Sequence, residues 1–216
     1  LMIATAARDL THFPESARVL LPDGYPPVGE WGTPPPRIKL GNLATTLRHL
    51  RDSGPRDFYE GEIARSLISD LSAGGNKITD EDLRSYAAQV MPAEKENYHN
   101  ATVHAAPGLT AGPTLLAALE RLSDCALGDI PNADTYLAYA ECLETAYTER
   151  FETMGDSNDS RAPSCTTHIS AVDRDGNFVS LTQTLLSLFG SKVMLPGTGI
   201  LMNNGIMWFD PRPGRP

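Results

Sequence analysis

The feature that most constrains the fold of this sequence is a pair of strand-like runs at 166–172 and 178–185. Both runs are rich in β-branched residues, and the loop Asp173-Arg174-Asp175-Gly176-Asn177 separates them. Alternating runs around such a loop are typical of an antiparallel hairpin. Two turns compete. A two-residue turn at Asp175-Gly176 would pair Arg174 with Asn177, whereas a three-residue loop with Gly176 in the left-handed conformation would pair Asp173 with Asn177.

The choice of turn decides which side chains share a face, because a slip by one residue moves side chains to the other face. The two-residue turn would set Ile169 against Thr182. The three-residue loop separates an apolar face from a polar face, and we prefer it for that reason. Its apolar pairs are Ile169 with Leu181 and Ala171 with Val179, and its polar pairs are Thr166 with Thr184, His168 with Thr182, and Ser170 with Ser180. Thr166 and Thr184 are thus predicted to lie side by side.

A polar strand face has two explanations, a solvated surface or a functional site. A threonine pair across a ladder stabilises a sheet without any further role, and His168 could equally be a structural, hydrogen-bonded histidine. The sequence contains no Ser-His-Asp order, nucleotide-binding glycine fingerprint or metal-ligand spacing, so we expect no metal and no cofactor. The remaining histidines are scattered without ligand spacing: His12, His49, His99 and His104.

The sequence before residue 165 predicts a mostly helical scaffold. Helices are expected at 3–21, 40–51, 58–72, 80–86, 113–124 and 134–153, with a Pro/Gly-rich loop at 22–36, a short strand at 101–106 and a polar loop at 156–160. Two apolar stripes indicate core faces: Ile63, Leu67, Ile68 and Leu71 in one helix, and Leu137, Ala140, Leu143 and Tyr147 in another. Thr79 begins a capping-box pattern for the helix at 80–86.

Composition restricts the classes of function. Among 216 residues, 27 acidic side chains outnumber 18 basic ones, and the net charge of −9 argues against a nucleic-acid partner. A hydrophobic share of 41% suffices for a core, but no apolar run approaches the roughly 18 residues of a membrane segment.

Cys125, Cys142 and Cys165 have no metal-ligand spacing and cannot all pair, so we expect no disulfide framework. Neither end resembles a natural boundary or a signal peptide, and we expect an excerpt of a longer protein.

Residues 165–177 read Cys-Thr-Thr-His-Ile-Ser-Ala-Val-Asp-Arg-Asp-Gly-Asn, and Thr182-Gln183-Thr184 follows. This arrangement resembles the processing site of the γ-glutamyltransferase (γ-glutamyltranspeptidase) family, which has Thr-Thr-His, a hairpin closing on Asp-Gly-Asn, and then Thr-x-Thr. The resemblance continues in order at 58–64, 83–86, 105–107, 189–190 and 199–204. The sequence is therefore similar to the part of that family that spans the junction of its large and small subunits.

The resemblance implies an α+β fold of the N-terminal-nucleophile hydrolase type, an αββα sandwich of stacked antiparallel sheets between helical layers, of which this chain holds a part. It implies self-cleavage between Cys165 and Thr166. Residues 1–165 would then be the mostly helical large-subunit-like part, and residues 166–216 the start of the strand-rich small-subunit-like part. Thr166 would be the nucleophile, its freed α-amine the base, and Thr184 the threonine that hydrogen-bonds the nucleophile.

The same resemblance implies the partners: a small-molecule γ-glutamyl or acyl amide as substrate, and the large and small subunits of one precursor. Homo-oligomer formation is left open. A periplasmic or secreted location is implied, and a cytoplasmic one is left open.

Three residues depart from the family pattern at positions that hold the γ-glutamyl group. Leu186 stands where the family has Asn, and Gly205 and Trp208 replace the Gln (or Glu) and the Asp of Asn-Asn-Gln-x-x-Asp. We therefore take all three as candidate substrate-binding residues with altered γ-glutamyl recognition. The family's substrate-binding Arg and its Gly-Gly oxyanion hole fall outside this chain.

Three functions are consistent with these residues. The first is a self-processing γ-glutamyltransferase or glutathione hydrolase that works through an ester on Thr166. The second is a related acylase of the same mechanism, which Leu186 and Trp208 favour. The third is a non-catalytic scaffold that kept the fold.

Overall fold

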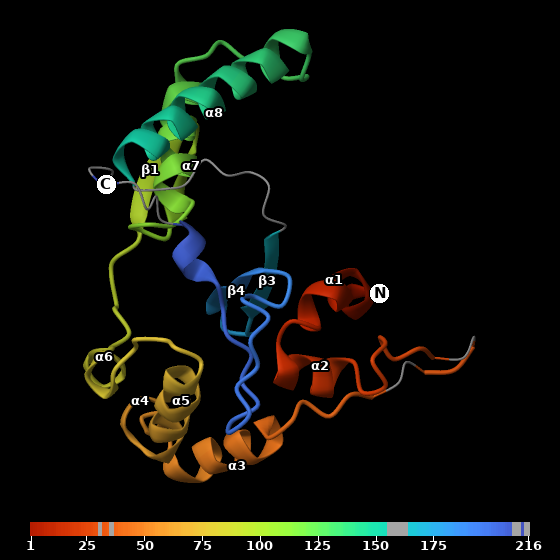
Figure 1. The fold of residues 1–216 in the computed structure, drawn as a ribbon. Helices are drawn as coiled ribbons and strands as arrows, with labels where there is room; N and C mark the ends of the chain where they lie inside the picture. Colours follow the sequence, from red (N-terminus) through yellow and green to blue (C-terminus); the bar gives the residue numbers. More distant parts are fainter. Residues whose placement is uncertain (30–31, 35–36, 155–163, 209–212, 214–216) are drawn as a thin grey trace. The chain divides into compact units, whose positions relative to one another are not determined.

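A computed structural model describes residues 1–29, 32–34, 37–154, 164–208 and 213. The chain is mixed α+β, which confirms that part of the expected fold, and it divides into two compact units (Figure 1). One unit comprises Leu1–Ala87 with Arg161–Gly205, and the other comprises Ala88–Ser160 with Ile206–Pro216. Strands in the described part of the chain form two two-stranded sheets, one in each unit, and these residues do not show the αββα sandwich. The polar loop expected at 156–160 lies outside the described residues.

The elements divide between the units as follows. The first unit contains α1 (Met2–Leu10), α2 (Pro14–Leu20), α3 (Leu43–Ser53), α4 (Asp57–Glu60), α5 (Glu62–Ala73), α6 (Asp80–Ser85), β3 (Ser164–Val172) and β4 (Phe178–Ser187). The second contains β1 (Glu94–Tyr98), β2 (Ala101–Ala105), α7 (Gly112–Ser123) and α8 (Ala133–Thr153). A short 3-10 turn, η1 (Gly205–Trp208), begins at the last residue of the first unit.

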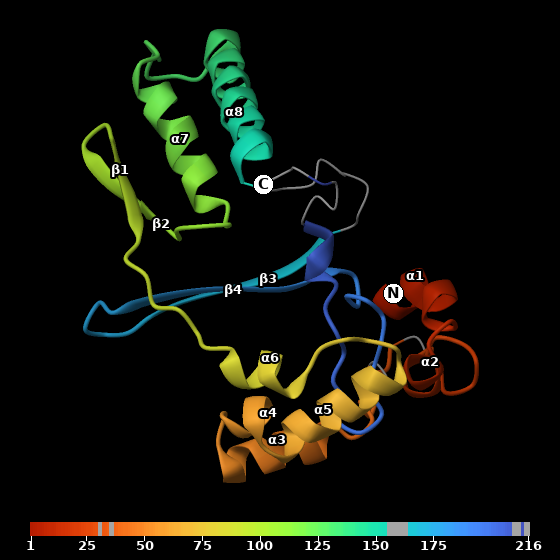
Figure 2. The same cartoon turned by 60° about the vertical axis from the view of Figure 1, so that its left-hand side comes forward.

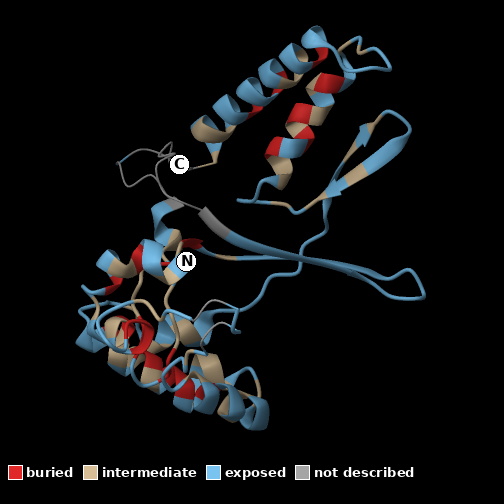
Figure 3. Cartoon of the chain, turned by 90° about the vertical axis from the view of Figure 1, so that its right-hand side faces the viewer, coloured by how far each residue is buried: buried red, intermediate tan, exposed pale blue. Residues whose placement is uncertain are grey.

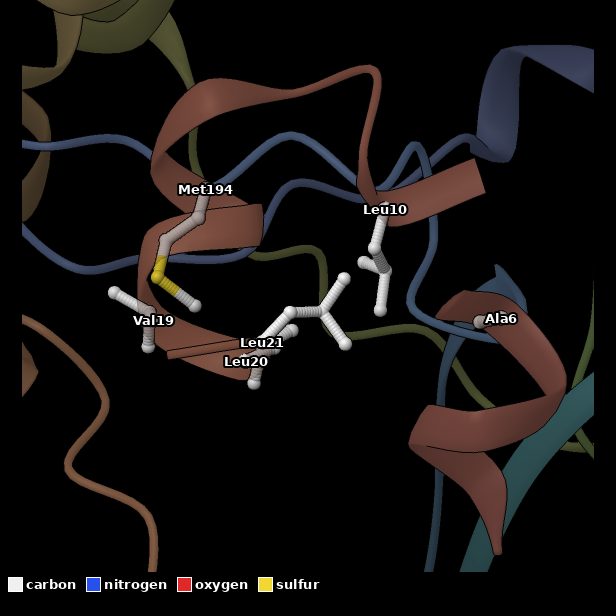
Figure 4. Close-up of a cluster of buried hydrophobic side chains, with 6 residues drawn as sticks. All are labelled: Ala6, Leu10, Val19, Leu20, Leu21 and Met194. Carbon is white, nitrogen blue, oxygen red and sulfur yellow. The ribbon is translucent and has the colours of Figure 1, made fainter. Parts of the chain in front are cut away.

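The single helix expected at 3–21 is wrong, because Pro14 divides it into α1 and α2. Proline lacks a backbone N–H and its ring collides with the preceding turn, so a helix tolerates it only at its start. Pro14 is the first residue of α2. The two helices share a cluster of buried side chains (Figure 4): Ala6, Leu10, Val19, Leu20, Leu21 and Met194.

The helix expected at 58–72 is also divided, into α4 and α5 at Gly61. The Asp57 carboxylate turns back over residue 61 and accepts hydrogen bonds from the amides of Glu62 (3.1 Å) and Ile63 (3.0 Å). A Cβ at residue 61 would lie 1.8 Å from Asp57 Oδ1, so this cap requires glycine. The stripe predicted for α5 is confirmed: Ile63, Leu67 and Leu71 are buried and Ile68 is half-buried. The capping box at Thr79 is confirmed at the start of α6.

The segment 188–204 ties the helices of the first unit together. Met194 packs in the cluster of α1 and α2, whereas its neighbour Leu195 packs in a second cluster with Ile63, Leu67 and Leu71. Ser16 Oγ donates to Lys192 O (2.5 Å) and accepts from the Met194 amide (3.0 Å). Thr46 Oγ1 donates to Thr198 O at 2.7 Å. The same segment leads from the end of β4 to residues 203–205, so the packed helices support one end of the hairpin.

In the second unit, α7 and α8 pack side by side, and α7 also contacts the β1–β2 hairpin (Figure 2). The core face expected for α8 is wrong. Leu137, Leu143 and Tyr147 are 57%, 45% and 47% exposed, Ala140 is exposed, and the buried residues of α8 are Thr135, Cys142 and Ala146 (Figure 3). Small side chains on this face let α7 approach closely, which the apolar periodicity of α8 does not reveal.

Candidate functional site

The β3–β4 hairpin has the register that the sequence predicts. Val172 pairs with Phe178, the Asp173 amide donates to Asn177 O at 3.0 Å, and Gly176 has a φ of +82°. This geometry is that of the three-residue loop with a left-handed glycine. The pairs on both faces are confirmed: Ile169 with Leu181, Ala171 with Val179, His168 with Thr182, and Ser170 with Ser180.

The carboxylate of Asp173 holds the loop of this hairpin. Its Oδ1 accepts from the amides of Asp175 and Asn177, both at 2.9 Å, and its Oδ2 accepts from Asn177 Nδ2 at 2.7 Å. These bonds, that from the Asn177 side chain first, lower the pKa of Asp173 below its ordinary value. The loop is therefore fixed by an ionised side chain, which sets the register of the strands that follow.

The two candidate catalytic threonines lie directly opposite each other. Thr166 on β3 pairs with Thr184 on β4. Opposed residues in an antiparallel ladder have Cβ atoms about 4.5–5.5 Å apart, so the two hydroxyls are within reach of each other. Thr166 is exposed and Thr184 is half-buried, and most of the hairpin is open to solvent (Figure 3).

The ladder is irregular just beyond the threonines. Ser164 pairs with Ser187 and Thr166 with Thr184, so three steps along β4 span two steps along β3. A β-bulge of this kind bends a strand and redirects its side chains, and bulges are frequent beside active sites. Leu186 lies in the bulge with a buried side chain and a φ of +74°, a conformation that Asn tolerates better than Leu. Its amide donates to Thr184 Oγ1 at 2.9 Å.

Asn204 fixes the end of β4. Its Oδ1 accepts from the Ser187 amide (3.0 Å), its Nδ2 donates to Ser187 Oγ (2.8 Å), and its own amide donates to Leu185 O (3.1 Å). These bonds place the segment that carries Gly205 beside the bulge. This role of Asn204 does not follow from the local sequence pattern, in which its one signal is the Asn203-Asn204 run ahead of Gly205.

His168 is the centre of a hydrogen-bond network on the polar face. Its Nδ1 lies 2.7 Å from Thr182 Oγ1, and its Nε2 lies 3.1 Å from both Ser170 Oγ and Ser180 Oγ. Both ring nitrogens therefore already have hydroxyl partners. This occupancy favours a structural role for His168.

The structure brings together Thr166, Thr184, Leu186 and Gly205 in the first unit. The backbone of Cys165 belongs to β3, and Trp208 ends η1. The side chains of both residues lie outside the described part of the chain.

Within that part, no group of three or more His, Cys, Asp or Glu side chains could hold a metal ion. The described helices include none that is both long and apolar enough to span a membrane.

Comparison with known proteins assigns the family. The family model described as Gamma-glutamyltranspeptidase matches residues 2–165 and 157–215. The chain belongs to the γ-glutamyltranspeptidase family. Its curated relatives include the Acylase ACY 1 proenzyme of Pseudomonas sp. (strain SE83). That protein is 27% identical over 250 residues and matches 99% of this chain. The Glutathione hydrolase proenzymes of Escherichia coli (strain K12) and Pseudomonas sp. (strain A14) are 29% and 30% identical and match 81% and 85% of it.

The chain spans less than half the length of these relatives: 44% of the acylase, and 37% and 39% of the two glutathione hydrolases. Among solved structures, cephalosporin acylase from Bacillus halodurans has a TM-score of 0.82 at 21% identity, over 98% of this chain and 45% of that one. Helicobacter pylori gamma-Glutamyltranspeptidase has a TM-score of 0.59 at 21% identity, over 74% of this chain and 45% of that one. These likenesses show that the chain has part of their common fold.

Proposed function

We propose that this chain carries the self-processing site and the nucleophile of a γ-glutamyltransferase-like amidase. The observation that carries the proposal is the pairing of Thr166 with Thr184 on the open polar face of β3 and β4. Membership of the family supports it, because relatives matched over the same residues are named as proenzymes of acylases and of glutathione hydrolases. In the whole protein, the hairpin would form part of the αββα sandwich that the family resemblance implies.

Processing would begin with attack by Thr166 Oγ on the carbonyl carbon of Cys165. The peptide C–N bond breaks as an ester C–O bond forms, and the hydroxyl proton passes to the new α-amine. Water then hydrolyses the ester and leaves a carboxylate on Cys165. Cleavage frees the α-amine of Thr166. An α-amine has an ordinary pKa of about 7.7–8.0, so a useful fraction of it is neutral near physiological pH. This amine can then serve in later steps as the base that His168 does not supply.

Turnover would use the same hydroxyl. Thr166 Oγ attacks the carbonyl carbon of an amide substrate, the amine leaves with a proton, and the acyl group stays on Thr166 as an ester until water or an acceptor amine removes it. The oxygen of Thr184 already accepts a hydrogen bond from the Leu186 amide. Its O–H is therefore suited to donate toward Thr166 Oγ and to fix the orientation of that hydroxyl for attack.

An acylase that does not require a γ-glutamyl group is the second candidate, and the environment of Leu186 favours it. The family pattern places Asn at this position, whereas Leu186 is apolar and buried. Gly205 also offers no side chain to a substrate. Both replacements remove hydrogen-bonding groups from the region expected to hold the α-amino and α-carboxylate ends of a γ-glutamyl group.

Mass analysis of the whole protein tests the processing step. We expect two chains, with the second beginning at Thr166, and a single uncut, inactive chain in Thr166→Ala. Thr167→Ala is the matched control, because Thr167 pairs with Gln183 on the opposite face of the hairpin and should leave cleavage intact. Cleavage at the same bond in Thr166→Ala would refute the assignment of the nucleophile.

A pair of anilides separates the two candidate functions. γ-Glutamyl and glutaryl p-nitroanilides differ only in the α-amino group, so the ratio of their kcat/KM values measures recognition of that group. A ratio in favour of γ-glutamyl supports the first function, and an equal or reversed ratio supports the acylase. Trp208→Asp restores an anion at the position where the family has one, and we expect it to shift the ratio toward the γ-glutamyl substrate.

A further inference from the structure

Asn204 holds the two peptide groups that flank Leu186. Its own amide donates to Leu185 O at 3.1 Å, which fixes the peptide group between residues 185 and 186. Its side chain fixes the next peptide group, because Oδ1 accepts from the Ser187 amide at 3.0 Å. A further bond, from Asn204 Nδ2 to Ser187 Oγ at 2.8 Å, joins the two side chains. Ser187 is 7% exposed and Asn204 is half-buried, so these bonds are partly shielded from water.

The segment that carries Asn204 is fixed by bonds of its own. The amide and the hydroxyl of Ser191 both donate to Met202 O at 3.0 Å, and the Met202 amide donates to Val193 O at 2.9 Å. A Cβ at residue 190 would lie 2.3 Å from Met202 O, so Gly190 permits this close approach. The backbone at 202 is therefore held in place without help from the Asn204 side chain.

Leu186 has a conformation that its surroundings must maintain. Its φ is +74°, which leucine disfavours, and such a conformation persists only where neighbouring contacts determine it. The peptide group between Leu185 and Leu186 is planar, so its C=O and N–H point in fixed, opposite directions. The C=O accepts from the Asn204 amide, and the N–H donates to Thr184 Oγ1 at 2.9 Å. The orientation of the Thr184 hydroxyl thus depends on how Asn204 holds the bulge.

We propose that Asn204 is a positioning residue that acts through Ser187 and the Leu186 amide to set the direction in which the Thr184 hydroxyl donates. Its effect on turnover rests on the function proposed above, whereas the clamp on the bulge does not. Loss of the Asn204 side chain leaves the bond from its amide to Leu185 O in place. We therefore expect the segment to stay docked while Leu186 becomes free to leave its left-handed conformation.

Hydrogen exchange in the whole protein tests the clamp without reference to activity. Asn204→Leu keeps the branched shape and removes both polar groups of the side chain. We expect the protection factors of the Leu186 and Ser187 amides to fall by roughly 2–13-fold, the size expected for one neutral hydrogen bond. Mass spectrometry with electron-transfer fragmentation of peptides that cover 184–188 measures this fall.

Asn42→Leu is the matched control, because Asn42 Nδ2 donates to Pro196 O at 2.8 Å and so joins α3 to the same segment. It should leave exchange at 186 and 187 unchanged. Ser187→Ala, which removes only the bond between the two side chains, is the milder variant and should lower protection in the same direction by less. Unchanged protection in both clamp variants, or equal falls in Asn204→Leu and Asn42→Leu, would overturn the proposal.

A double-mutant cycle tests the effect on turnover. We expect Asn204→Leu to lower kcat/KM about as much as Thr184→Val does, through kcat rather than KM. Since Asn204 acts through Thr184, the double variant should be no less active than either single one. Losses that multiply would overturn the positioning role, because Asn204 would then act independently of Thr184. An inactive wild type would refute the proposed function instead, and exchange at Leu186 would still decide whether Asn204 holds the partner of Thr184.

Discussion

The amide of Leu186 donates a hydrogen bond of 2.9 Å to Oγ1 of Thr184. This contact occupies one acceptor site of the hydroxyl and leaves its proton to point elsewhere, and Thr166 is the residue directly across the ladder. We therefore expect the bulge around Leu186 to orient Thr184 as a donor toward the proposed nucleophile.

Thr184→Val keeps the branched shape of the side chain and removes the hydroxyl. A neutral hydrogen bond contributes about 0.5–1.5 kcal/mol, which corresponds to roughly a 2–13-fold lower kcat/KM if it is made in the transition state. The loss is larger if the bond strengthens in the transition state. Measurement of kcat/KM beside a thermal melt separates this effect from unfolding.

Thr184→Ser is the control for that variant, because it keeps the hydroxyl and loses only a methyl group. We expect near-normal turnover and an intact acceptor for the Leu186 amide. Equal losses in Thr184→Val and Thr184→Ser would show that packing, rather than hydrogen bonding, is the contribution of residue 184.

Leu186→Asn should change substrate preference and lower the stability of the fold. Asn suits the φ of +74° better, but the variant loses a buried leucine side chain, which is worth about 1.5–3 kcal/mol. The new amide supplies a hydrogen-bonding group beside the site, so the ratio of γ-glutamyl to glutaryl anilide turnover should rise. Leu186→Ala loses the same burial without adding an amide, and a rise in the ratio in that variant would contradict the explanation.

The hairpin was predictable because its determinants are local. Alternation over 166–172 and 178–185, one glycine at 176 and one aspartate at 173 suffice to choose the register, and Thr79 likewise caps a helix with a residue three positions away. The helices end or begin at Pro14 and Gly61, which are residue types that commonly interrupt helices. The apolar periodicity nevertheless continues through both positions, so it predicts one helix where there are two. The sequence does not predict β1, because its Glu-Lys-Glu-Asn-Tyr sequence lacks β-branched residues.

The features that escaped prediction depend on contacts between distant parts of the chain. Asn204 acts on Ser187, 17 residues away, through a bond that no local pattern encodes. The buried face of α8 is chosen by α7, which needs the small side chains of Cys142 and Ala146 rather than the larger apolar stripe of the helix. The conformation of Leu186 is set by the bulge in β4 and not by its own preference.

Protonation of Asp173 should loosen the hairpin loop. Its pKa is lowered in the folded chain, so its contribution to stability is present at neutral pH and is lost as pH falls through the unfolded value near 3.8 and then the lower folded one. The protection factor of the Asn177 amide, which is the intrinsic exchange rate at each pH divided by the rate observed by NMR, should fall across that range. Asp173→Ala should show fast exchange at neutral pH, whereas Asp175→Ala, which keeps all the Asp173 contacts, should match the wild type. Slow exchange in Asp173→Ala would contradict this role.

Gly199 should be among the least replaceable residues of the first unit, because two constraints coincide there. Its φ is +71°, and a Cβ would lie 2.4 Å from the Leu43 amide nitrogen and 2.7 Å from Leu40 O, both backbone atoms that cannot rotate away. We expect Gly199→Ala to lower the free energy of unfolding by about 2–4 kcal/mol, the sum of left-handed strain and overpacking. Gly75→Ala separates the two terms, since its φ is +81° but its Cβ would meet no heavy atom of the described chain within 4 Å. That control should lose only about 1–2 kcal/mol. Denaturant melts of the two variants measure these losses. Equal losses would contradict the explanation, because they would show that the close approach of residue 199 to the start of α3 adds no cost to the backbone strain.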